Sequence, residues 1–264
     1  MKIKENQVIL LIGGTGFIGK NLVNTLINSG HELVILARDW SHVPELFFNF
    51  PQIKVIEVSL NELDKVASIV DELSIDLVIH MASGIVAGSD KKECNNELLN
   101  IVLPTMKLLD MLSQKSIKVI FFSSGGTIYG NKSDLITEES ELEPINYYGY
   151  SKLLIEQYIL FLSRLLKLEY VIVRPSNVYG KLQNIDETQG FIEVAIGKIL
   201  DNKTIEIWGS GKQTRDFIHI SDVCTAINKI VSQGISNKII NIACGKSHSL
   251  LEIIDILEKE LNMK

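Results

Sequence analysis

The chain has 264 residues, 46% of them hydrophobic, which is enough to build one α/β domain with a full core and a smaller lobe. Its 26 basic and 32 acidic side chains give a net charge of -6 without long charged blocks, so we expect no binding to nucleic acid or to a membrane. The three cysteines are far apart and not spaced as metal ligands, which predicts reduced core thiols and no metal. No apolar run reaches membrane-spanning length, and we expect a cytoplasmic protein.

The first element is an apolar run over 8–12 that leads directly into a glycine-rich turn. Such a run is typical of a strand buried on both faces, and the apolar stripe that follows predicts a helix ending near Gly30. Glycines at this spacing allow a tight turn and leave the helix N–H groups free to bind a pyrophosphate. The alternative is a purely structural turn, since this glycine spacing also arises by chance. The expected cofactor contacts in the turn are Gly13, Gly16, Phe17, Ile18 and Gly19.

Strand-like and helix-like segments alternate along the chain and predict a Rossmann-like, doubly wound parallel sheet. The expected strands are near 7–12, 31–37, 53–58, 76–81, 117–123 and 170–175, and the expected helices are near 17–29, 61–72, 95–114 and 148–167. The polar stretch 125–144 is predicted to be a functional or mobile loop whose acidic run, 138–141, is a solvated surface.

After residue 176 the pattern is less regular and predicts a small C-terminal substrate lobe. The expected elements are helices near 191–201, 222–233 and 249–262 and strands near 204–208, 215–220 and 238–243. We therefore predict a dinucleotide-binding Rossmann domain over 1–176 and a mainly substrate-binding lobe over 177–264, with some of its segments returning to the Rossmann domain.

A tyrosine and a lysine at the start of the helix after the fifth strand are the strongest candidates for catalysis. Tyr148 and Lys152 are one helical turn apart, so they lie on the same face. Lowering a tyrosine pKa from about 10 toward neutrality takes roughly 4 kcal/mol, which a nearby ammonium and an oxidised nicotinamide can supply together. The spacing alone is common, and the alternative is an ordinary surface pair. The position favours a site, because ligands bind at the carboxyl ends of parallel strands, where Ser123 to Gly130 also follow a strand.

Several motifs in this order resemble the extended short-chain dehydrogenase/reductases, and among them the epimerases and dehydratases of nucleotide sugars. Besides the glycine turn and the Tyr148/Lys152 pair, the motifs are His80-Met81-Ala82, Ser123-Ser124-Gly125-Gly126-Thr127-Ile128-Tyr129-Gly130, Arg174-Pro175-Ser176-Asn177-Val178-Tyr179-Gly180, Ile207-Trp208-Gly209-Ser210-Gly211 and Arg215-Asp216-Phe217-Ile218-His219-Ile220-Ser221-Asp222-Val223. The resemblance covers nearly the whole chain.

The resemblance implies roles for particular residues. Tyr148 is the implied general base, taking a proton from a sugar hydroxyl as hydride passes from C4 to the nicotinamide. Lys152 is implied to hold the cofactor ribose and to lower the pKa of Tyr148, and Ala82 is a further implied cofactor contact. On the substrate side, the resemblance implies that Asn177 contacts the phosphates, Arg215 neutralises the diphosphate, and Trp208 or Ile207 lines the slot for the base. The alternative role for Arg215 is a surface ion pair with Asp216 or Asp222.

The chain departs from the family pattern in the motif after the fifth strand. Gly125 stands where the family usually has a catalytic serine or threonine. Ser124 or Thr127 can supply the missing hydroxyl, and we favour Thr127. Gly126 and Thr127 also replace the Asp-Glu pair of the dehydratases, which disfavours dehydration and leaves epimerisation or keto reduction.

The end of the second strand leaves the cofactor open between NAD and NADP. The acid that usually binds the adenosine ribose is replaced by Ala37 and followed by Arg38, which can accommodate a 2′-phosphate. Asp39 can still reach the ribose if the turn is longer. We expect NAD, with NADP as the alternative.

These observations predict an enzyme, a nucleotide-sugar 4-epimerase that acts on a UDP-hexose or a related sugar through reversible oxidation at C4. One alternative is an NADPH-dependent 4-keto nucleotide-sugar reductase. Another is a non-catalytic dinucleotide-binding relative, prompted by Gly125 and by an end soon after the last helix, where the family usually continues. We expect a truncated chain or a minimal lobe there. A homodimer is expected through helices 95–114 and 148–167, with apolar residues Leu153, Leu154, Tyr158, Leu162 and Leu165 shared between core and interface.

Overall fold

The computed structural model describes residues 6–132, 134–183, 190–207 and 209–261. Its main sheet has seven strands in the order β3-β2-β1-β4-β5-β6-β9, and every neighbouring pair is parallel. These strands are β1 (Val8–Ile12), β2 (Glu32–Ala37), β3 (Ile53–Glu57), β4 (Leu77–His80), β5 (Lys118–Phe122), β6 (Tyr170–Pro175) and β9 (Lys238–Ile242). The order reverses between β1 and β4, which is the point where doubly wound sheets bind ligands. The predicted Rossmann-like fold is confirmed.

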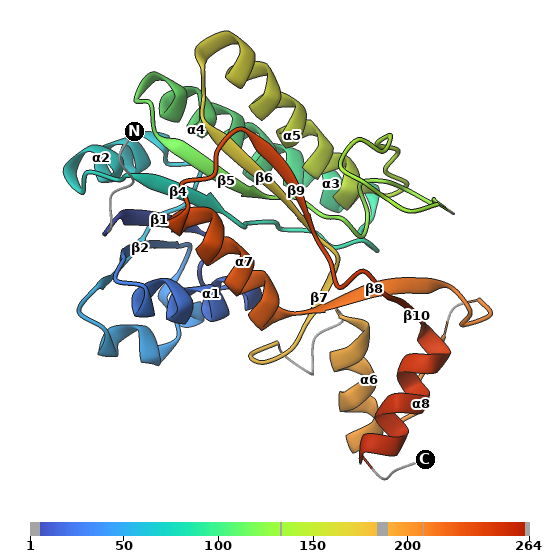
Figure 1. The fold of residues 1–264 in the computed structure, drawn as a ribbon. Coiled ribbons are helices and arrows are strands. Elements are labelled where there is room, and N and C mark those ends of the chain that lie inside the picture. Colours follow the sequence, from blue (N-terminus) through green and yellow to red (C-terminus); the bar gives the residue numbers. More distant parts are fainter. Residues whose placement is uncertain (1–5, 133, 184–189, 208, 262–264) are drawn as a thin grey trace.

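Helices cover both faces of this sheet, as Figure 1 shows. One face carries α1 (Phe17–Asn28) and α7 (Ile220–Ser232), and the other carries α2 (Leu63–Glu72), α4 (Leu103–Gln114) and α5 (Tyr147–Leu166). Alternate residues of β1 enter two separate cores: Ile9 and Leu11 pack toward α1 and α7, while Leu10 and Ile12 pack toward the other layer. Burial on both faces explains why the strand sequence is continuously apolar. Between β2 and β3, two 3₁₀ turns, η1 (Trp40–His42) and η2 (Glu45–Asn49), close one edge.

The helix expected near 95–114 begins earlier and has three parts. It starts as α3 (Lys91–Glu97), continues through a π-helical segment η3 (Leu98–Val102) and becomes α4. A capping box sets the early start, since Asp90 accepts from the Glu93 amide and Glu93 accepts from the Asp90 amide. Pro104, which has no N–H to donate, lies in the first turn of α4, just after the π-helical segment.

A second, three-stranded sheet in the order β10-β8-β7 lies beside the main one (Figure 1). It is formed by β7 (Asn177–Tyr179), β8 (Thr214–His219) and β10 (Ser247–Ser249), with α6 (Phe191–Leu200) and α8 (Leu250–Leu261) packed together next to it. The sequence predicted neither β7 nor β10. A strand was expected near 204–208. This prediction is wrong for 204–207, because no strand pairs with this segment, although Ile205 and Ile207 are less exposed than Glu206 between them. Trp208 lies outside the described residues.

Cys94 and Cys224 are buried free thiols, as predicted, whereas Cys244 is exposed, which corrects its assignment to the core. Among the described residues, none of the helices combines the length and the apolar character needed to cross a bilayer.

A buried ion pair ties α5 to the main sheet. Arg174 of β6 donates from Nε to Glu156 Oε1 at 3.0 Å and from Nη2 to Oε2 at 2.6 Å, and the two side chains are 2% and 0% exposed. Arg174 also donates to the hydroxyl of Tyr129 at 2.8 Å and to the carbonyl of Glu138 at 3.3 Å. The long predicted loop is therefore anchored at two points. Its Glu138 side chain also accepts from the amide of Asn241, so this part of the acidic run is not simply solvated surface.

Replacing Glu156 with glutamine should leave the Arg174 charge buried without its partner. We expect E156Q to lower the free energy of unfolding by about 3–5 kcal/mol in urea titrations. D201N removes the exposed pair Asp201–Lys203, whose side chains are 56% and 68% accessible, and should change it by less than about 0.5 kcal/mol. Equal effects in the two variants would contradict the assigned importance of the buried pair.

Candidate active site

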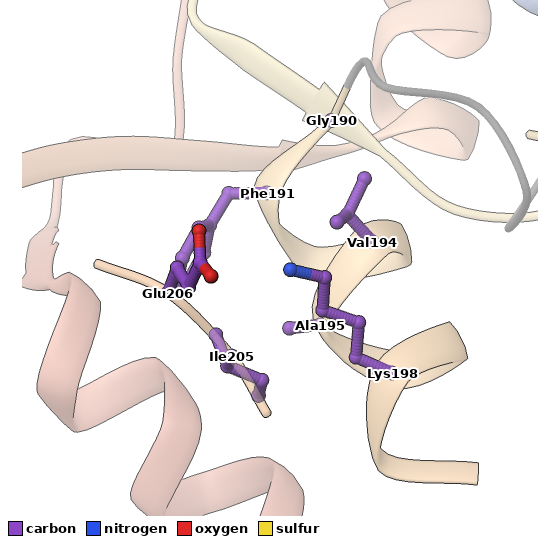
Figure 2. A pocket seen from close by; sticks show the side chains of 7 residues that line it. All are labelled: Gly190, Phe191, Val194, Ala195, Lys198, Ile205 and Glu206. Carbon is purple, nitrogen blue, oxygen red and sulfur yellow. The ribbon is translucent and has the colours of Figure 1, made fainter. Parts of the chain in front are cut away.

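A cavity of about 960 Å³ lies at the carboxyl ends of β1, β4, β5 and β6. Its wall combines the glycine turn, the segment after β4, the end of β5, the start of α5 and parts of β7, β8 and α6. A second pocket, of about 180 Å³, lies between α6 and residues 205–206. Figure 2 shows the side chains of Lys198 and Glu206 facing it from opposite sides. Of these two pockets among the described residues, the larger has the volume of an ordinary ligand site.

The glycine turn of this cavity has no room for side chains at two of its glycines. Gly13 has φ +85°, and a Cβ there would lie 2.8 Å from the amide nitrogen of Ala82. A Cβ on Gly19 would lie 2.5 Å from the Cα of Gly14. Helix α1 begins after Gly16 without a side-chain cap or an acid in its first turn, and Gly13, Gly16, Phe17, Ile18 and Gly19 all line the cavity. The uncapped N–H groups form the anion site that a pyrophosphate needs.

Arg38 and Asp39 follow β2 and have different roles. Arg38 lines the cavity. Asp39 is engaged as the cap of η1, because its carboxylate accepts from the Ser41 amide at 2.6 Å and contacts His42 Nδ1 at 3.1 Å. The local structure thus leaves Arg38 as the side chain that faces a ligand here.

Tyr148 and Lys152 enter the cavity from the first turns of α5, whose N-cap is Asn146. Lys152 is 2% exposed, its Nζ donates to the carbonyl of Ala82 at 3.2 Å, and it lies 5.5 Å from the ring centre of Tyr148. Ala82 itself does not line the cavity, whereas its neighbours Met81 and Ser83 do. Ala82 lies between Gly13 and Lys152, and its expected contact with the cofactor stays a prediction.

Ser124, and not Thr127, provides the hydroxyl next to Tyr148. The two side chains form a hydrogen bond that lowers the pKa of Tyr148, whereas Thr127 Oγ1 is buried and has no partner among the described residues. Gly125 is explained by packing: a Cβ there would lie 2.9 Å from the carbonyl oxygen of Arg174. Its backbone N–H donates to Pro175 at 2.8 Å. The preference for Thr127 is therefore not supported. Although residue 125 is glycine, the site still has a hydroxyl group next to Tyr148, that of Ser124.

Burial and nearby charge set the ionisation of this group. Burial, followed by the charge of Glu97, raises the pKa of Tyr148 to about 12. Burial also lowers the pKa of Lys152 to about 8, and the charge of Glu97 opposes that shift. Burial and the Lys152 charge lower the pKa of His80 to about 3, so this imidazole, which bonds Thr105 at 2.8 Å, is neutral. At neutral pH the protein alone therefore holds Tyr148 as a phenol beside an ammonium.

The predicted substrate residues Asn177 and Arg215 both line the cavity. Asn177 Nδ2 donates to the carbonyl of Asp216 at 2.8 Å. Among the residues that the structure describes, Arg215 forms no ion pair, and the Asp216 carboxylate accepts instead from Ser176 and from the amides of Cys244 and Gly245. Arg215 is therefore available to an anionic ligand. Trp208, the predicted wall of the base slot, lies outside the described residues.

Two buried carboxyl groups were not predicted: Glu193, which lines the cavity, and Glu97, which lies behind the lining residues Ser83 and Gly84. Glu97 is 2% exposed and accepts from Ser83 and Gly84. Glu193 is 5% exposed and accepts from the Gly180 amide at 2.7 Å, while its Oε2 has no partner among the described residues. A capping box at Asp90 and an apolar spacing through Cys94 and Ile101 are the sequence signals that put Glu97 on a buried helix face. Glu193 carries no such signal.

Comparison with known proteins identifies the family of the chain. The family model of the NAD dependent epimerase/dehydratase family matches residues 9–243. This chain belongs to that family. It is 34% identical over 97% of its length to a putative UDP-glucose 4-epimerase of Methanocaldococcus jannaschii, covering 83% of that protein. It is also 33% identical over 100% of its length to a dTDP-4-dehydro-6-deoxyglucose reductase of Escherichia coli, covering 84% of it.

Solved epimerases have the same fold as this family member. A UDP-N-acetylglucosamine 4-epimerase of Methanobrevibacter ruminantium M1, in complex with UDP-N-acetylmuramic acid, superposes with a TM-score of 0.88 at 26% identity, over 98% of this chain and 83% of that one. A UDP-glucose 4-epimerase of Thermotoga maritima, with UDP-glucose, gives 0.86 at 25% identity, over 96% and 82%. These two structures are epimerases, whereas the sequence relatives also include a reductase.

The residues of the cavity fit the family's cofactor, NAD. Gly13 and Gly19 let the turn pack directly against the backbones of Ala82 and Gly14, and α1 directs uncapped N–H groups to the place that a pyrophosphate would occupy. NAD as the expected cofactor is confirmed at the level of the family.

Two glycine substitutions should separate folding from cofactor binding. G16A adds a Cβ at 3.4 Å from the Gly13 carbonyl, in a backbone that any residue adopts, so we expect unchanged thermal unfolding but at least about tenfold weaker NAD binding by calorimetry. G13A combines positive φ with a backbone clash and should weaken both. Full NAD affinity in G16A would contradict the assigned pyrophosphate site.

Proposed function

We propose that the protein is a nucleotide-sugar 4-epimerase that acts on a UDP-linked hexose or a related sugar. The observation that carries the proposal is the grouping of Tyr148, Lys152 and Ser124 in the lining of a cavity that Asn177 and Arg215 also line. The putative epimerase relative and the epimerase structures support it. Gly126 and Thr127 supply no carboxyl group next to Ser124, which disfavours the elimination of water.

In this proposal the side chains take one proton from the C4 hydroxyl of the sugar and later return it to the same oxygen. NAD, held by the glycine turn and Lys152, would supply reversible hydride transfer at C4 of the sugar. Ser124 bonds Tyr148 and relays the proton of the C4 hydroxyl to the phenolate oxygen; reduction returns it to the C4 oxygen. With the pKa of Tyr148 at about 12, the Lys152 charge alone does not make the phenol a base at neutral pH. The positive charge of an oxidised nicotinamide, once bound beside Tyr148, would lower this pKa, as a neighbouring ammonium does.

Arg215 and α1 are proposed to hold the two anionic parts of the ligands. The planar guanidinium donates in pairs to a diphosphate, and no described acid competes for it. Asn177, whose amide is oriented by Asp216, contacts the same phosphates in this arrangement.

Replacing Tyr148 with phenylalanine should remove the proton carrier and leave the fold intact. We expect Y148F to lower the turnover of UDP-glucose to UDP-galactose by roughly 10²- to 10⁴-fold, with unchanged NAD affinity. Tyr150, two residues away and 48% exposed, provides the matched control, and Y150F should keep full turnover. Product is measured by chromatography of the nucleotide sugars, and full epimerase turnover in Y148F would rule out the proposed role.

A second candidate function is an NADPH-dependent reduction of a 4-keto nucleotide sugar. Arg38 in the cavity, with Asp39 occupied as a cap, favours a cofactor that carries a 2′-phosphate. The dTDP-4-dehydro-6-deoxyglucose reductase relative supports the same reading. A reductase consumes its cofactor and must release it, whereas an epimerase regenerates it within one cycle.

Substitution of Arg38 distinguishes the two candidates. If the protein is a reductase of this kind, R38A should weaken NADPH binding at least about tenfold and leave NADH binding unchanged, as measured by fluorescence titration. If it is an epimerase with tightly held NAD, the conversion of UDP-glucose should be unaffected by added NADPH and also by the R38A substitution. K54A provides a charge control on the neighbouring strand β3.

We also propose a cytoplasmic homodimer formed through η3, α4 and α5. Leu99, Leu103, Phe161 and Leu165 are between 45% and 64% exposed on these elements, which supports an apolar interface there. Leu162 is buried in the core, as the shared apolar face requires. Sedimentation equilibrium tests the assembly, and a monomer at all concentrations would contradict it.

A further inference from the structure

Glu97 on α3 is a buried acid that the proposed reaction does not use. It is 2% exposed, and its two carboxylate oxygens accept from Ser83 Oγ at 2.9 Å and from the Gly84 amide at 2.7 Å. Both donors belong to the segment after β4, and both line the large cavity. A carboxylate so deeply buried is retained only where it is paired or hydrogen-bonded, and here its bonds lead to the wall of the site.

The same short segment also carries the bond of Lys152. The carbonyl of Ala82 accepts from Lys152 Nζ at 3.2 Å, immediately before the two residues that bind Glu97. On its other side the segment touches the glycine turn, since a Cβ on Gly13 would lie 2.8 Å from the Ala82 amide. Residues 82–84 therefore join a buried cation, a buried anion and the cofactor turn.

We propose that Glu97 is a positioning residue that holds residues 82–84 against Lys152 and provides the counter-charge of the Lys152 ammonium. A carboxylate at this place stabilises the ammonium and destabilises the phenolate of Tyr148. In agreement with this sign, the Glu97 charge raises the pKa of both Lys152 and Tyr148. Glu97 thus keeps Lys152 charged and Tyr148 protonated, the form that returns a proton to a sugar oxyanion.

The other groups that face this pair do not replace Glu97. His80, at the end of β4, is neutral because burial and Lys152 lower its pKa to about 3. Ser124 contributes a hydroxyl from the end of β5, and Phe121 contributes an aromatic ring 5.2 Å from Lys152 Nζ. Among the described side chains around Lys152, Glu97 supplies the negative charge.

The effect on Lys152 can be measured in the protein alone, whereas the effect on proton return rests on the proposed function. In protein labelled with ¹³C-lysine, the Lys152 signal is assigned by its loss in K152R and followed through a pH titration. We expect E97Q to lower the Lys152 pKa by about one unit. E97D keeps the charge and should stay closer to the wild-type value. E93Q preserves the capping box one turn earlier on the same helix and should leave the titration unchanged.

An unchanged or higher Lys152 pKa in folded E97Q would overturn the proposal, whatever the protein's activity. Thermal unfolding of each variant establishes that it is folded. If E97Q does not fold, S83A carries the test, because it removes one donor to the Glu97 carboxylate and should shift the Lys152 titration, while E97D is the charge-preserving comparison. A Lys152 titration in folded S83A that is identical to wild type then overturns the positioning role. If the protein turns over a nucleotide sugar, the acidic limb of the plot of turnover against pH should move to lower pH in E97Q. This last measurement alone rests on the proposed function, so failure of that function leaves the test of the Lys152 pKa intact.

Discussion

The buried contact between Arg174 and Glu156 fixes the helix on which the candidate chemistry depends. Glu156 lies one helical turn after Lys152 on α5, so a bidentate bond from β6 to Glu156 also sets the rotation of the helix about its axis. That rotation directs Lys152 to Ala82 and brings Tyr148 beside Ser124. Because both charges are almost fully buried, neither can be lost without leaving the other unpaired, and the contact tolerates little movement.

Asp216 has the equivalent function for the smaller sheet. Its carboxylate accepts from Ser176, at the link between β6 and β7, and from the amides of Cys244 and Gly245, which follow β9. A single side chain thus connects β8 to two points at the end of the main sheet. The neighbouring residue on β8 is Arg215, so the distance between the proposed diphosphate contact and the nucleotide turn is set by this connection. The alternative in which Arg215 pairs with Asp216 fails because Asp216 is already committed to these donors.

Local patterns predicted the elements of the site, and long-range packing decided its details. The continuous apolar run of β1, the glycine turn and the Tyr148/Lys152 spacing are properties of short segments, so the sequence was enough to predict them.

The choice between Ser124 and Thr127 depends on how Gly125 packs against the Arg174 carbonyl of a strand about fifty residues away in the chain, and no local pattern carries that contact. The short strands β7 and β10 exist only because β8 lies between them, and residues 204–207, which alternate like a strand, have no such neighbour. Glu97 was missed because the helix was expected to begin near residue 95, which left out the capping box at Asp90 and the turn with Cys94 that place Glu97 on a buried face.

The proposed catalytic group alone does not choose between epimerisation and reduction. In the proposed mechanism Tyr148, Lys152 and Ser124 carry one proton in either direction, and the same phenol serves oxidation and reduction. The two reactions differ in what surrounds this group. An epimerase must let the keto sugar present its opposite face while the cofactor stays in place, and so needs room around the ring and firm anchoring at the phosphates. A reductase needs a cofactor that leaves, and so depends on contacts at the far end of the dinucleotide. The cavity of about 960 Å³ and the uncommitted Arg215 meet the first requirement, while Arg38 at the end of β2 meets the second. The distinction therefore depends on the two ends of the cavity, far from the atoms that react.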